Sequence, residues 1–464
     1  MASHSNTAPL TRRHFVGAAI AGAGTLALAG SGGWLARSAL AAKPGGGTAT
    51  RYPLRRLAIV APGPLRAAPG SVDIGGGKTA KGLLYNSTLP GPVFAVRTGD
   101  SVSIPFTNGL SEPTTVHWHG LVVPTAVDGQ PQDPIAPGES FDYSFTVAQR
   151  AGMSWYHPHP DMATSSQVAL GLAGGFLIRD AEEDRLGLPS GMFEVPLVLR
   201  DANFDKAGNL SYNGTASGFT GKTLLVNGVR DPYLATSPAI HRFRILGGSN
   251  SRVFRLALSN GAPFTLIGND GGLLPSAVTV SEIEVSPGER VDVLVDLRGA
   301  RNGTVSLRDL NSGWTLLELR VADTAPVVGA LPSGPLSVVT TLGTPVRTRT
   351  FSFDGMTRIN GQLFDLNRID FPVPLGQVED WVFVTGGNAP HPVHIHGASF
   401  QVISRTGGRG RLFPWEAGWK DTVLLDDGET VTVRIRFDLA GRYLMHCHKL
   451  EHEDAGMMLN FDVV

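Results

Sequence analysis

One sequence pattern occurs three times along the chain, and this repeat constrains the fold more than any other feature. Each copy has a Gly-Glu turn followed by a run in which apolar and polar residues alternate. The three copies are Pro137-Gly-Glu-Ser-Phe-Asp-Tyr-Ser-Phe, Pro287-Gly-Glu-Arg-Val-Asp-Val-Leu-Val and Asp427-Gly-Glu-Thr-Val-Thr-Val-Arg-Ile. Because such alternation is typical of a half-buried strand, the repeat predicts three copies of one small antiparallel β-sandwich.

Histidine pairs belong to this pattern in the outer two copies only. His157-Pro-His159 follows the first run and His446-Cys-His448 follows the last, whereas Arg308 and Leu310 stand at these positions in the middle copy. An earlier segment behaves in the same way: the three versions are His117-Trp-His119-Gly120, Leu258-Ser-Asn260-Gly261 and His394-Ile-His396-Gly397. The middle copy therefore keeps the scaffold without the histidines, and we expect it to act as a spacer.

The composition supports an all-β protein of several domains. The 464 residues include 58 Gly and 32 Pro, and only 17% are charged, against roughly 25% in an average globular protein. Short Val/Thr/Leu-rich runs between turn residues are typical of sandwiches. The predicted organisation is an export signal at 1–42, a lead-in segment at 43–66 and domains at 67–185, 190–325 and 340–464.

Charge and cysteine content exclude some classes of function. The formal net charge of −1 gives no reason to expect nucleic acid or an anionic membrane as a partner. The single cysteine excludes an intramolecular disulfide, so stability must come from large cores.

The N-terminus resembles a twin-arginine export signal. Arg12-Arg13 precedes a weakly apolar run rich in Gly and Ala, and Ala39-Leu-Ala41 offers a small-residue cleavage site. The run is too interrupted by Gly to predict a membrane span, although a plain secretory signal and an uncleaved anchor remain alternatives. We expect export by the twin-arginine machinery to the periplasm or the extracellular space, with the protein already folded.

The histidines gather in four short segments. The chain has 13, of which His4 and His14 lie in the signal and His241 stands alone in the middle copy, where a surface or core role is expected. The other ten are His117, His119, His157, His159, His391, His394, His396, His446, His448 and His452. Each His-x-His on a strand directs two imidazoles to one side, which is the arrangement a metal needs.

The only cysteine lies inside the last of these segments. Two His and a Cys with a weak axial Met are the ligands of a blue-copper site, and Cys447, His452 and Met457 follow one another at intervals of five. If residues 443–448 form a strand, His446 and His448 share one face and Cys447 takes the other. Cys447 would then connect its own metal to a second site through two neighbouring residues. Zinc could suit a single pair, but its four-ligand sites would not use all these residues.

These segments resemble the four signature segments of the three-domain multicopper oxidases, with laccase-like and periplasmic cuprous oxidases of bacteria as the nearest likeness. The four are His117-Trp-His-Gly, His157-Pro-His, His391-Pro-Val-His-Ile-His and His446-Cys-His-x3-His-x4-Met. The likeness runs from about residue 85 to the C-terminus. It implies three cupredoxin-like Greek-key sandwich domains and four copper ions: one type 1, one type 2 and two type 3.

The resemblance also implies a role for each ligand. The type 1 copper takes His391, Cys447, His452 and axial Met457, and the type 2 copper takes His117 and His394. The type 3 pair takes the remaining histidines: His119, His157, His159, His396, His446 and His448. In the family reaction a small substrate gives single electrons to the type 1 copper, and they pass through Cys447 to the cluster, where dioxygen becomes two waters.

Two acids match carboxylates that the family uses near the cluster. Asp128 follows His117 in Ala-Val-Asp-Gly, and Glu453 directly follows His452. We predict that both assist proton transfer. The alternatives are a turn Asp beside Gly and a solvated Glu.

The substrate is the least constrained feature of the sequence. Cuprous oxidases of this family carry a Met-rich insert in the third domain, with Asp and Met four and two residues before the type 1 histidine. Here the corresponding region has the single Met356, and Gly387 and Ala389 stand at the two positions. This pattern favours phenols or aromatic amines over Cu(I).

Three other functions remain as hypotheses. A metal oxidase for Cu(I) or Mn(II) is the nearest. A copper-free envelope or division scaffold of the same fold would not need the complete ligand set. An electron-carrying cupredoxin would need only the type 1 ligands.

Overall fold

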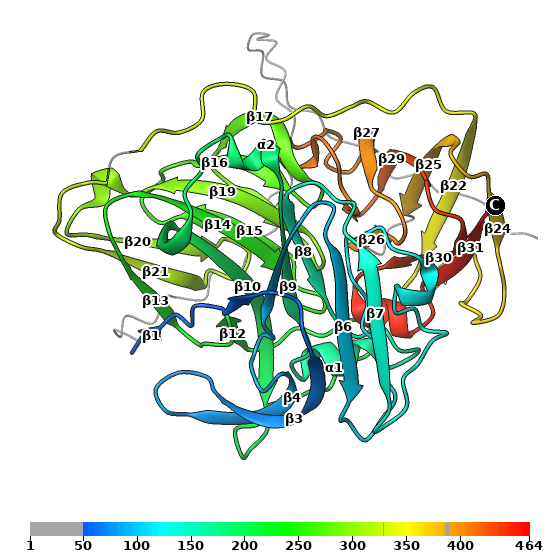
Figure 1. The fold of residues 1–464 in the computed structure, drawn as a ribbon, viewed down its shortest axis with the longest axis horizontal. Coiled ribbons are helices and arrows are strands. Elements are labelled where there is room, and N and C mark those ends of the chain that lie inside the picture. Colours follow the sequence, from blue (N-terminus) through cyan, green and yellow to red (C-terminus); the bar gives the residue numbers. More distant parts are fainter. Residues whose placement is uncertain (1–49, 328, 386–389) are drawn as a thin grey trace, which may run out of the picture. The chain divides into compact units, whose positions relative to one another are not determined.

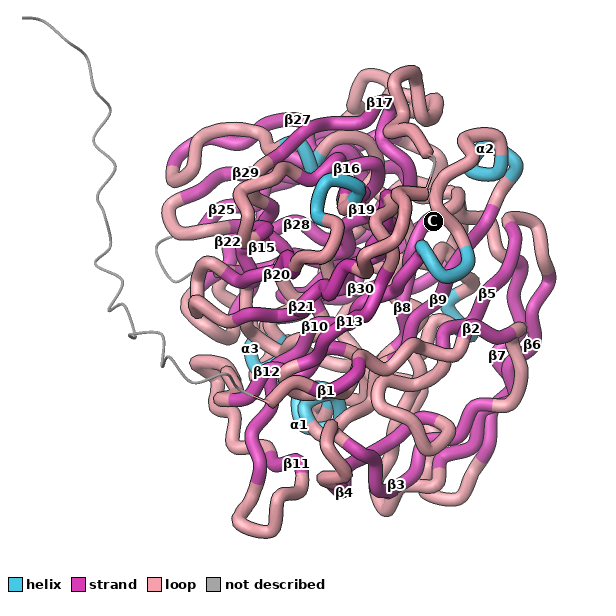
Figure 2. Tube along the Cα trace, turned by 90° about the vertical axis from the view of Figure 1, so that its left-hand side faces the viewer, coloured by secondary structure: helices cyan, strands magenta, loops and turns pink. Residues whose placement is uncertain are grey.

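The structure is a computed structural model, and it describes residues 50–327, 329–385 and 390–464. Strands dominate, and the helices are short turns between them (Figure 2). No helix among these residues is both long and apolar enough to cross a lipid bilayer. The predicted export signal at 1–42 lies outside the described residues.

The strands form six sheets, which follow one another along the chain as three pairs (Figure 1). The first pair has two four-stranded sheets. One runs β2 (Ile59–Val60), β5 (Val93–Arg97), β9 (Gly174–Arg179), β8 (Gly152–Tyr156), and the other β4 (Thr79–Tyr85), β3 (Leu65–Asp73), β6 (Ser101–Asn108), β7 (Ser140–Thr146).

The middle pair is the largest. Its six-stranded sheet runs β1 (Tyr52–Pro53), β13 (Pro232–Thr236), β21 (Thr315–Val321), β20 (Thr304–Asp309), β15 (Phe254–Leu258), β18 (Ile283–Val285). Its seven-stranded sheet runs β11 (Leu210–Ser211), β10 (Glu194–Phe204), β14 (Ile240–Gly247), β19 (Arg290–Asp296), β16 (Phe264–Asn269), β17 (Gly272–Val280), with β12 (Thr223–Val226) beside β10.

The last pair has two five-stranded sheets. One runs β23 (Arg358–Ile359), β22 (Arg347–Asp354), β25 (Val378–Thr385), β29 (Glu429–Arg436), β27 (Phe400–Gly407), and the other β24 (Phe371–Val373), β31 (Met458–Val463), β30 (Gly441–Cys447), β26 (His391–Ile395), β28 (Thr422–Leu425). The α-helices are α1 (Thr164–Ala169), α2 (Ala181–Asp184) and α3 (Leu450–Asp454). The described ranges also contain four 3-10 turns: Thr125–Val127, Gly191–Phe193, Arg298–Ala300 and Pro414–Glu416.

The alternating runs of the repeat are strands, as predicted. In β29 every second residue is buried, and the buried side chains pack into the core of the last sandwich. The equivalent runs form β7 and β19 in the other two copies. The sandwiches are present as predicted, but their sheets are mixed and not antiparallel throughout. The pairs β5–β9, β10–β14 and β22–β25 are parallel, because the chain crosses to the other sheet of the sandwich between the two strands of each pair and returns in the same direction.

The lead-in segment contributes two edge strands to different sheets. β1 pairs with β13 of the middle sandwich, and β2 pairs with β5 of the first. The segment therefore ties these two pairs of sheets together. The predicted domain limits themselves stay predictions.

Candidate metal centres

The end of β30 brings Cys447 close to two histidines. Cys447 Sγ lies 3.5 Å from Nδ1 of His391 and 3.6 Å from Nδ1 of His452, and the two Nδ1 atoms are 3.2 Å apart. His391 opens β26, which pairs with β30, and His452 lies in α3, the short helix that follows β30. All three side chains are buried.

This triangle has the dimensions of a three-ligand metal site. Ligand atoms about 2.1 Å from a central ion in a trigonal arrangement lie about 3.6 Å apart. Burial raises the pKa of Cys447 to about 12, and burial lowers the pKa of His452 to about 2, with Lys449 adding to the effect. His452 therefore keeps a free lone pair, and a metal would replace the proton of the Cys447 thiol.

The backbone of Met457 contacts two residues of the triangle. Its carbonyl accepts a hydrogen bond from Cys447 N at 3.1 Å, and its N–H donates to His452 O at 2.9 Å. The side chain is fully buried in the core of the last sandwich. Met457 thus joins the two ligand-bearing segments at the triangle.

The other eight histidines form a second cluster between the first and last sandwiches. They are His117, His119, His157, His159, His394, His396, His446 and His448, and all are buried. Backbone pairing aligns them: His117 and His157 form a bridge in the first sandwich, and His394 and His446 are opposite on β26 and β30 in the last.

Three of these rings converge through Nε2. Nε2 of His446 lies 3.3 Å from Nε2 of His159 and 3.2 Å from Nε2 of His396. Their Nδ1 atoms face acids. His396 Nδ1 lies 2.8 Å from Asp128 Oδ2, and Glu453 places its oxygens 3.0 Å from Nδ1 of His446 and 3.4 Å from Nδ1 of His159. Fixing one ring nitrogen leaves the other to face a metal.

A second group joins one histidine from each outer sandwich. Nε2 of His117 and Nε2 of His394 are 3.4 Å apart. Each ring donates its Nδ1 hydrogen to a backbone carbonyl, that of Asp128 at 2.9 Å for His117 and that of Asp421 at 2.8 Å for His394. Both rings therefore present an unprotonated Nε2 to the space between them.

The third group is His119, His157 and His448, whose ring centres lie 4.8 to 5.7 Å apart. Nδ1 of His119, Nε2 of His157 and both ring nitrogens of His448 are buried without a hydrogen-bond partner. Buried nitrogens are normally satisfied, so these atoms point to a missing ligand. Burial lowers the pKa of all three rings well below the usual value, which keeps their lone pairs free.

The structure therefore brings together every residue that the sequence analysis assigned to a site. Three of the residues predicted for type 1 copper form the triangle, and the fourth, Met457, reaches it through its backbone. The eight remaining histidines of the predicted set form the cluster, and Asp128 and Glu453 lie against its rings. His446, Cys447 and His448 are consecutive, so the triangle and the cluster are joined by two peptide units. His241 takes the core alternative: it is buried and bonded to Thr236 and Ser237.

Comparison with known proteins identifies the family. Family models described as multicopper oxidase match residues 67–183 and 334–464. The multicopper oxidase mco of Staphylococcus haemolyticus is 37% identical over 403 residues, which cover 85% of this chain and 86% of that protein. The chain belongs to the multicopper oxidase family.

Solved structures agree with this assignment and show the three-domain cupredoxin-like fold. A multicopper oxidase from Pediococcus acidilactici has a TM-score of 0.85 and 35% identity, covering 89% of this chain and 92% of that one. A laccase-like enzyme from Ochrobactrum, described with activity towards lignin model compounds, has a TM-score of 0.82 and 32% identity, covering 89% and 100%. A metallo-oxidase from Campylobacter jejuni has a TM-score of 0.80 and 29% identity, covering 89% and 95%.

One set of relatives has a different name. The cell division protein FtsP of Xenorhabdus nematophila is 34% identical over 371 residues, covering 75% of this chain and 78% of that protein. The family thus includes proteins named for cell division as well as oxidases.

The residues of this multicopper oxidase fit copper. A His₂Cys triangle with a nearby Met, and buried imidazoles with unpaired nitrogens, are soft and borderline donors of the kind that copper prefers. Hard cations such as Mg²⁺ would need oxygen ligands instead.

Sequence reasoning missed the residues that support the cluster from outside its motifs. Asp421 and Thr422 bond Nε2 of His119 at 3.1 and 3.0 Å. A Cβ on Gly288, in the middle copy of the repeat, would lie only 3.0 Å from His119 and 3.1 Å from His448. The only sequence signal for Asp421 was its position next to Lys420, before the apolar run 422–425. This signal does not indicate which residues Asp421 contacts.

Two surfaces of the oxidase bear on access to the metal sites. A cavity of about 410 Å³ is lined by Gly120 and Gly397, which directly follow the ligands His119 and His396. On the side of the Cys447 triangle, Leu363 lies over the Gly456 backbone and is about two-fifths exposed. Positions 387 and 389 lie outside the described residues.

Proposed function

We propose that this multicopper oxidase couples four one-electron oxidations of phenols or aromatic amines to the reduction of dioxygen to two waters. The observation that carries the proposal is that two sets of buried residues able to hold metal, the triangle and the histidine cluster, are joined through His446-Cys447-His448. A pure electron carrier would need only the first set. A copper-free scaffold would need neither.

We assign four coppers to the ligand groups described above. The triangle of His391, Cys447 and His452, with Met457, would hold type 1 copper. His117 and His394 would hold type 2 copper. Each of the two remaining groups would hold one type 3 ion. One group is His119, His157 and His448, and the other is His159, His396 and His446. Bound copper would supply one-electron redox chemistry and the binding of dioxygen.

The chain's own residues would direct this chemistry. Cys447 links the two sites covalently, and its burial keeps water away from the thiolate. Asp128 holds the Nδ1 hydrogen of His396, and Glu453 faces Nδ1 of His446 and of His159. We infer that these carboxylates hold protons and water beside the cluster, where four protons are consumed in each reaction cycle. The cavity beside Gly120 and Gly397 supports a route for dioxygen and water.

The preference for aromatic substrates rests on the type 1 side. The third domain has no Met-rich insert, and the surface over Gly456 presents the apolar side chain of Leu363. An aromatic ring can pack there, whereas the region that carries the insert in cuprous oxidases has here the single thioether of Met356. A metal oxidase for Cu(I) or Mn(II) stays as the second candidate, supported by the likeness to the Campylobacter metallo-oxidase.

Steady-state kinetics tests the substrate assignment. Copper-loaded protein is assayed with a substituted phenol, an aromatic amine and Cu(I) in parallel, with dioxygen uptake as the common readout. We expect higher kcat/KM for the phenol than for Cu(I). Saturable Cu(I) oxidation that exceeds every phenol would reverse the order, and the absence of dioxygen uptake with all three would favour the scaffold function.

We also propose that the protein is exported through the twin-arginine machinery to the periplasm or beyond. The support is Arg12-Arg13 with its following apolar run, which suits a protein that folds before transport. Replacing both arginines by lysine should retain the protein in the cytoplasm. Unchanged export of that variant would contradict the proposal.

A further inference from the structure

Asp421 contacts histidines from both outer sandwiches. Its carboxylate Oδ1 lies 3.1 Å from Nε2 of His119, and its backbone carbonyl accepts from Nδ1 of His394 at 2.8 Å. It directly precedes β28, which pairs with the strand that carries His394. One residue thus sets the orientation of two predicted ligands.

The middle sandwich holds Asp421 in place through Arg290, the first residue of β19. The two guanidinium Nη atoms bond the two carboxylate oxygens, at 2.7 Å for Oδ1 and 2.5 Å for Oδ2. The other donors of Arg290 bond the backbone carbonyls of Met153, Gly288 and Asp270. All five N–H groups of the guanidinium are therefore used, and the group is fixed in orientation.

The backbone around this pair leaves no spare room. Gly120 has a φ of +86°, and a Cβ there would lie 2.6 Å from Arg290 Nη2 and 2.7 Å from Asp421 Oδ2. The glycine that follows His119 is thus required for the pair to reach the ring. Arg290 and Asp421 are both almost fully buried, so water cannot substitute for either partner.

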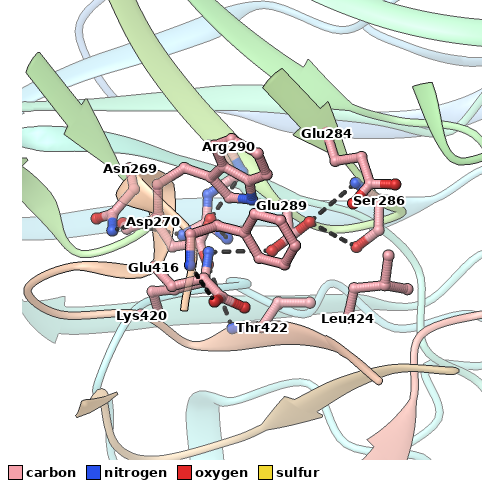
Figure 3. A network of polar contacts seen from close by, with 12 residues as sticks. Asn269, Asp270, Glu284, Ser286, Glu289, Arg290, Glu416, Lys420, Thr422 and Leu424 are labelled. Atoms are coloured by element: carbon pink, nitrogen blue, oxygen red, sulfur yellow. Dashed lines mark hydrogen bonds and ion pairs between the residues drawn. The ribbon is translucent and has the colours of Figure 1, made fainter. Parts of the chain in front are cut away.

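A second cation, Lys420, is buried beside this pair. Lys420 lies 2.8 Å from Asp270 Oδ2 and 3.1 Å from Glu289 Oε1, between two acids of the middle sandwich (Figure 3). Burial alone would lower the pKa of Arg290, but Asp421 and Asp270 outweigh it and raise that pKa, so the guanidinium stays charged. Every charge in the group therefore has an opposite partner.

We propose that Arg290, in the middle domain, is a positioning residue for the copper cluster: it clamps Asp421, which makes His119 donate from Nε2 and present Nδ1 as its ligand atom. The inference rests on the proposed function. It explains why Nδ1 is the ring nitrogen of His119 left without a partner, whereas His117, His157, His394 and His396 use Nδ1 for hydrogen bonds. The middle domain then not only spaces the two outer domains but also orients a ligand of the cluster.

Arg290→Lys tests the clamp, since an ammonium keeps the charge but cannot form the two-pronged contact. Loss of a residue that orients a metal ligand typically weakens metal binding ~10–100-fold. We expect such a loss in copper affinity at the cluster, measured by copper per chain during chelator titration. Because the carbonyl of Asp421 also orients His394, the proposed type 2 ligand, we further expect a changed type 2 hyperfine splitting in the electron paramagnetic resonance spectrum. The blue type 1 band and its reduction rate should stay unchanged.

Arg242→Lys is the matched control. Arg242 is equally buried in the same sandwich and makes a two-pronged contact with Asp292, but it bonds none of the histidines. Arg242→Lys should lower the stability of the protein but leave the copper affinity of the cluster and the type 2 hyperfine splitting unchanged. If both variants lose cluster copper equally, general destabilisation is the cause and the inference is wrong.

A second variant covers the case in which Arg290→Lys does not fold. Arg290→Met with Asp421→Asn removes both charges together, so no unpaired ion is left buried. We expect it to keep the blue band while its cluster binds copper more weakly, because the amide is no longer held in one orientation. Wild-type cluster affinity and hyperfine splitting in this variant would overturn the inference. Wild-type protein without blue colour or dioxygen uptake would instead overturn the proposed function.

Discussion

Replacing Glu453 by Gln separates the two halves of the proposed reaction. Glu453 lies in α3 directly after the type 1 residue His452, yet its carboxylate turns to the cluster and approaches Nδ1 of His446 at 3.0 Å and Nδ1 of His159 at 3.4 Å. Burial raises the pKa of this carboxyl, so it binds a proton more readily than an exposed Glu would. Gln keeps the size of the side chain and removes both the charge and the acid proton.

The magnitude follows from the proton-transfer group that is lost, since Glu453 is the buried acid that approaches both rings. Removing a proton-transfer group typically costs ~10²-fold or more. Reoxidation by dioxygen should therefore slow by at least about tenfold in Glu453→Gln.

Two half-reactions measured separately provide the assay. Anaerobic stopped-flow reduction of the blue band should proceed at the wild-type rate, because Cys447 and its ligand neighbours are unchanged. Mixing the reduced protein with dioxygen should show the slow phase. Asp128→Asn, which alters the contact with His396, should behave in the same way.

Glu451→Gln is the control for the same helix. Glu451 is also buried, but its oxygens bond Asn250 and Ser251 and no histidine. Its reoxidation rate should match that of the wild type. If Glu453→Gln and Asp128→Asn also reoxidise at the wild-type rate, the two carboxylates have no part in proton transfer.

Three further predictions concern the type 1 site and stability. Cys447→Ser should abolish the blue band and turnover while cluster copper largely remains; a retained band in the absorption spectrum would contradict the type 1 assignment. Met457→Leu removes a weak axial donor and should raise the type 1 potential in a redox titration, and an effect of Met458→Leu alone would make Met458 the ligand. Burial would raise the pKa of Glu194, but Arg244 and other arginines outweigh it and hold the pKa at about 2, against the usual 4.5. Because that folded-state pKa is depressed, its contribution of about 3 kcal/mol is complete above pH 4.5 and is lost as the pH falls towards 2. The free energy of unfolding of the copper-free wild type and of Glu194→Gln is measured by denaturant titration. The difference between the two should shrink as the pH falls from 4.5 towards 2, and a constant difference would refute the argument.

The residues of the candidate metal centres could be predicted from sequence because their signal is local. A His-x-His pair on a strand, or Cys447, His452 and Met457 at a fixed spacing, shows its chemistry within a few residues. The repeat in turn predicted the all-β sandwiches, since alternation reports which face of a strand is buried. The mixed direction of the sheets was missed, because the pairing of β5 with β9 or β22 with β25 depends on how long connections return and not on the strands themselves.

The supporting residues could be found only in the tertiary structure. Arg290 and Asp421 are 131 residues apart, in copies of the repeat that the sequence marked as different in role, and each alone resembles an ordinary surface charge. Their burial and pairing arise only when the middle sandwich packs against the last one. The sequence by itself determined which atoms can bind copper. Which nitrogen of His119 faces the cluster depends on a charge from another domain, because the tautomer of an imidazole is set by whatever its second nitrogen contacts in space.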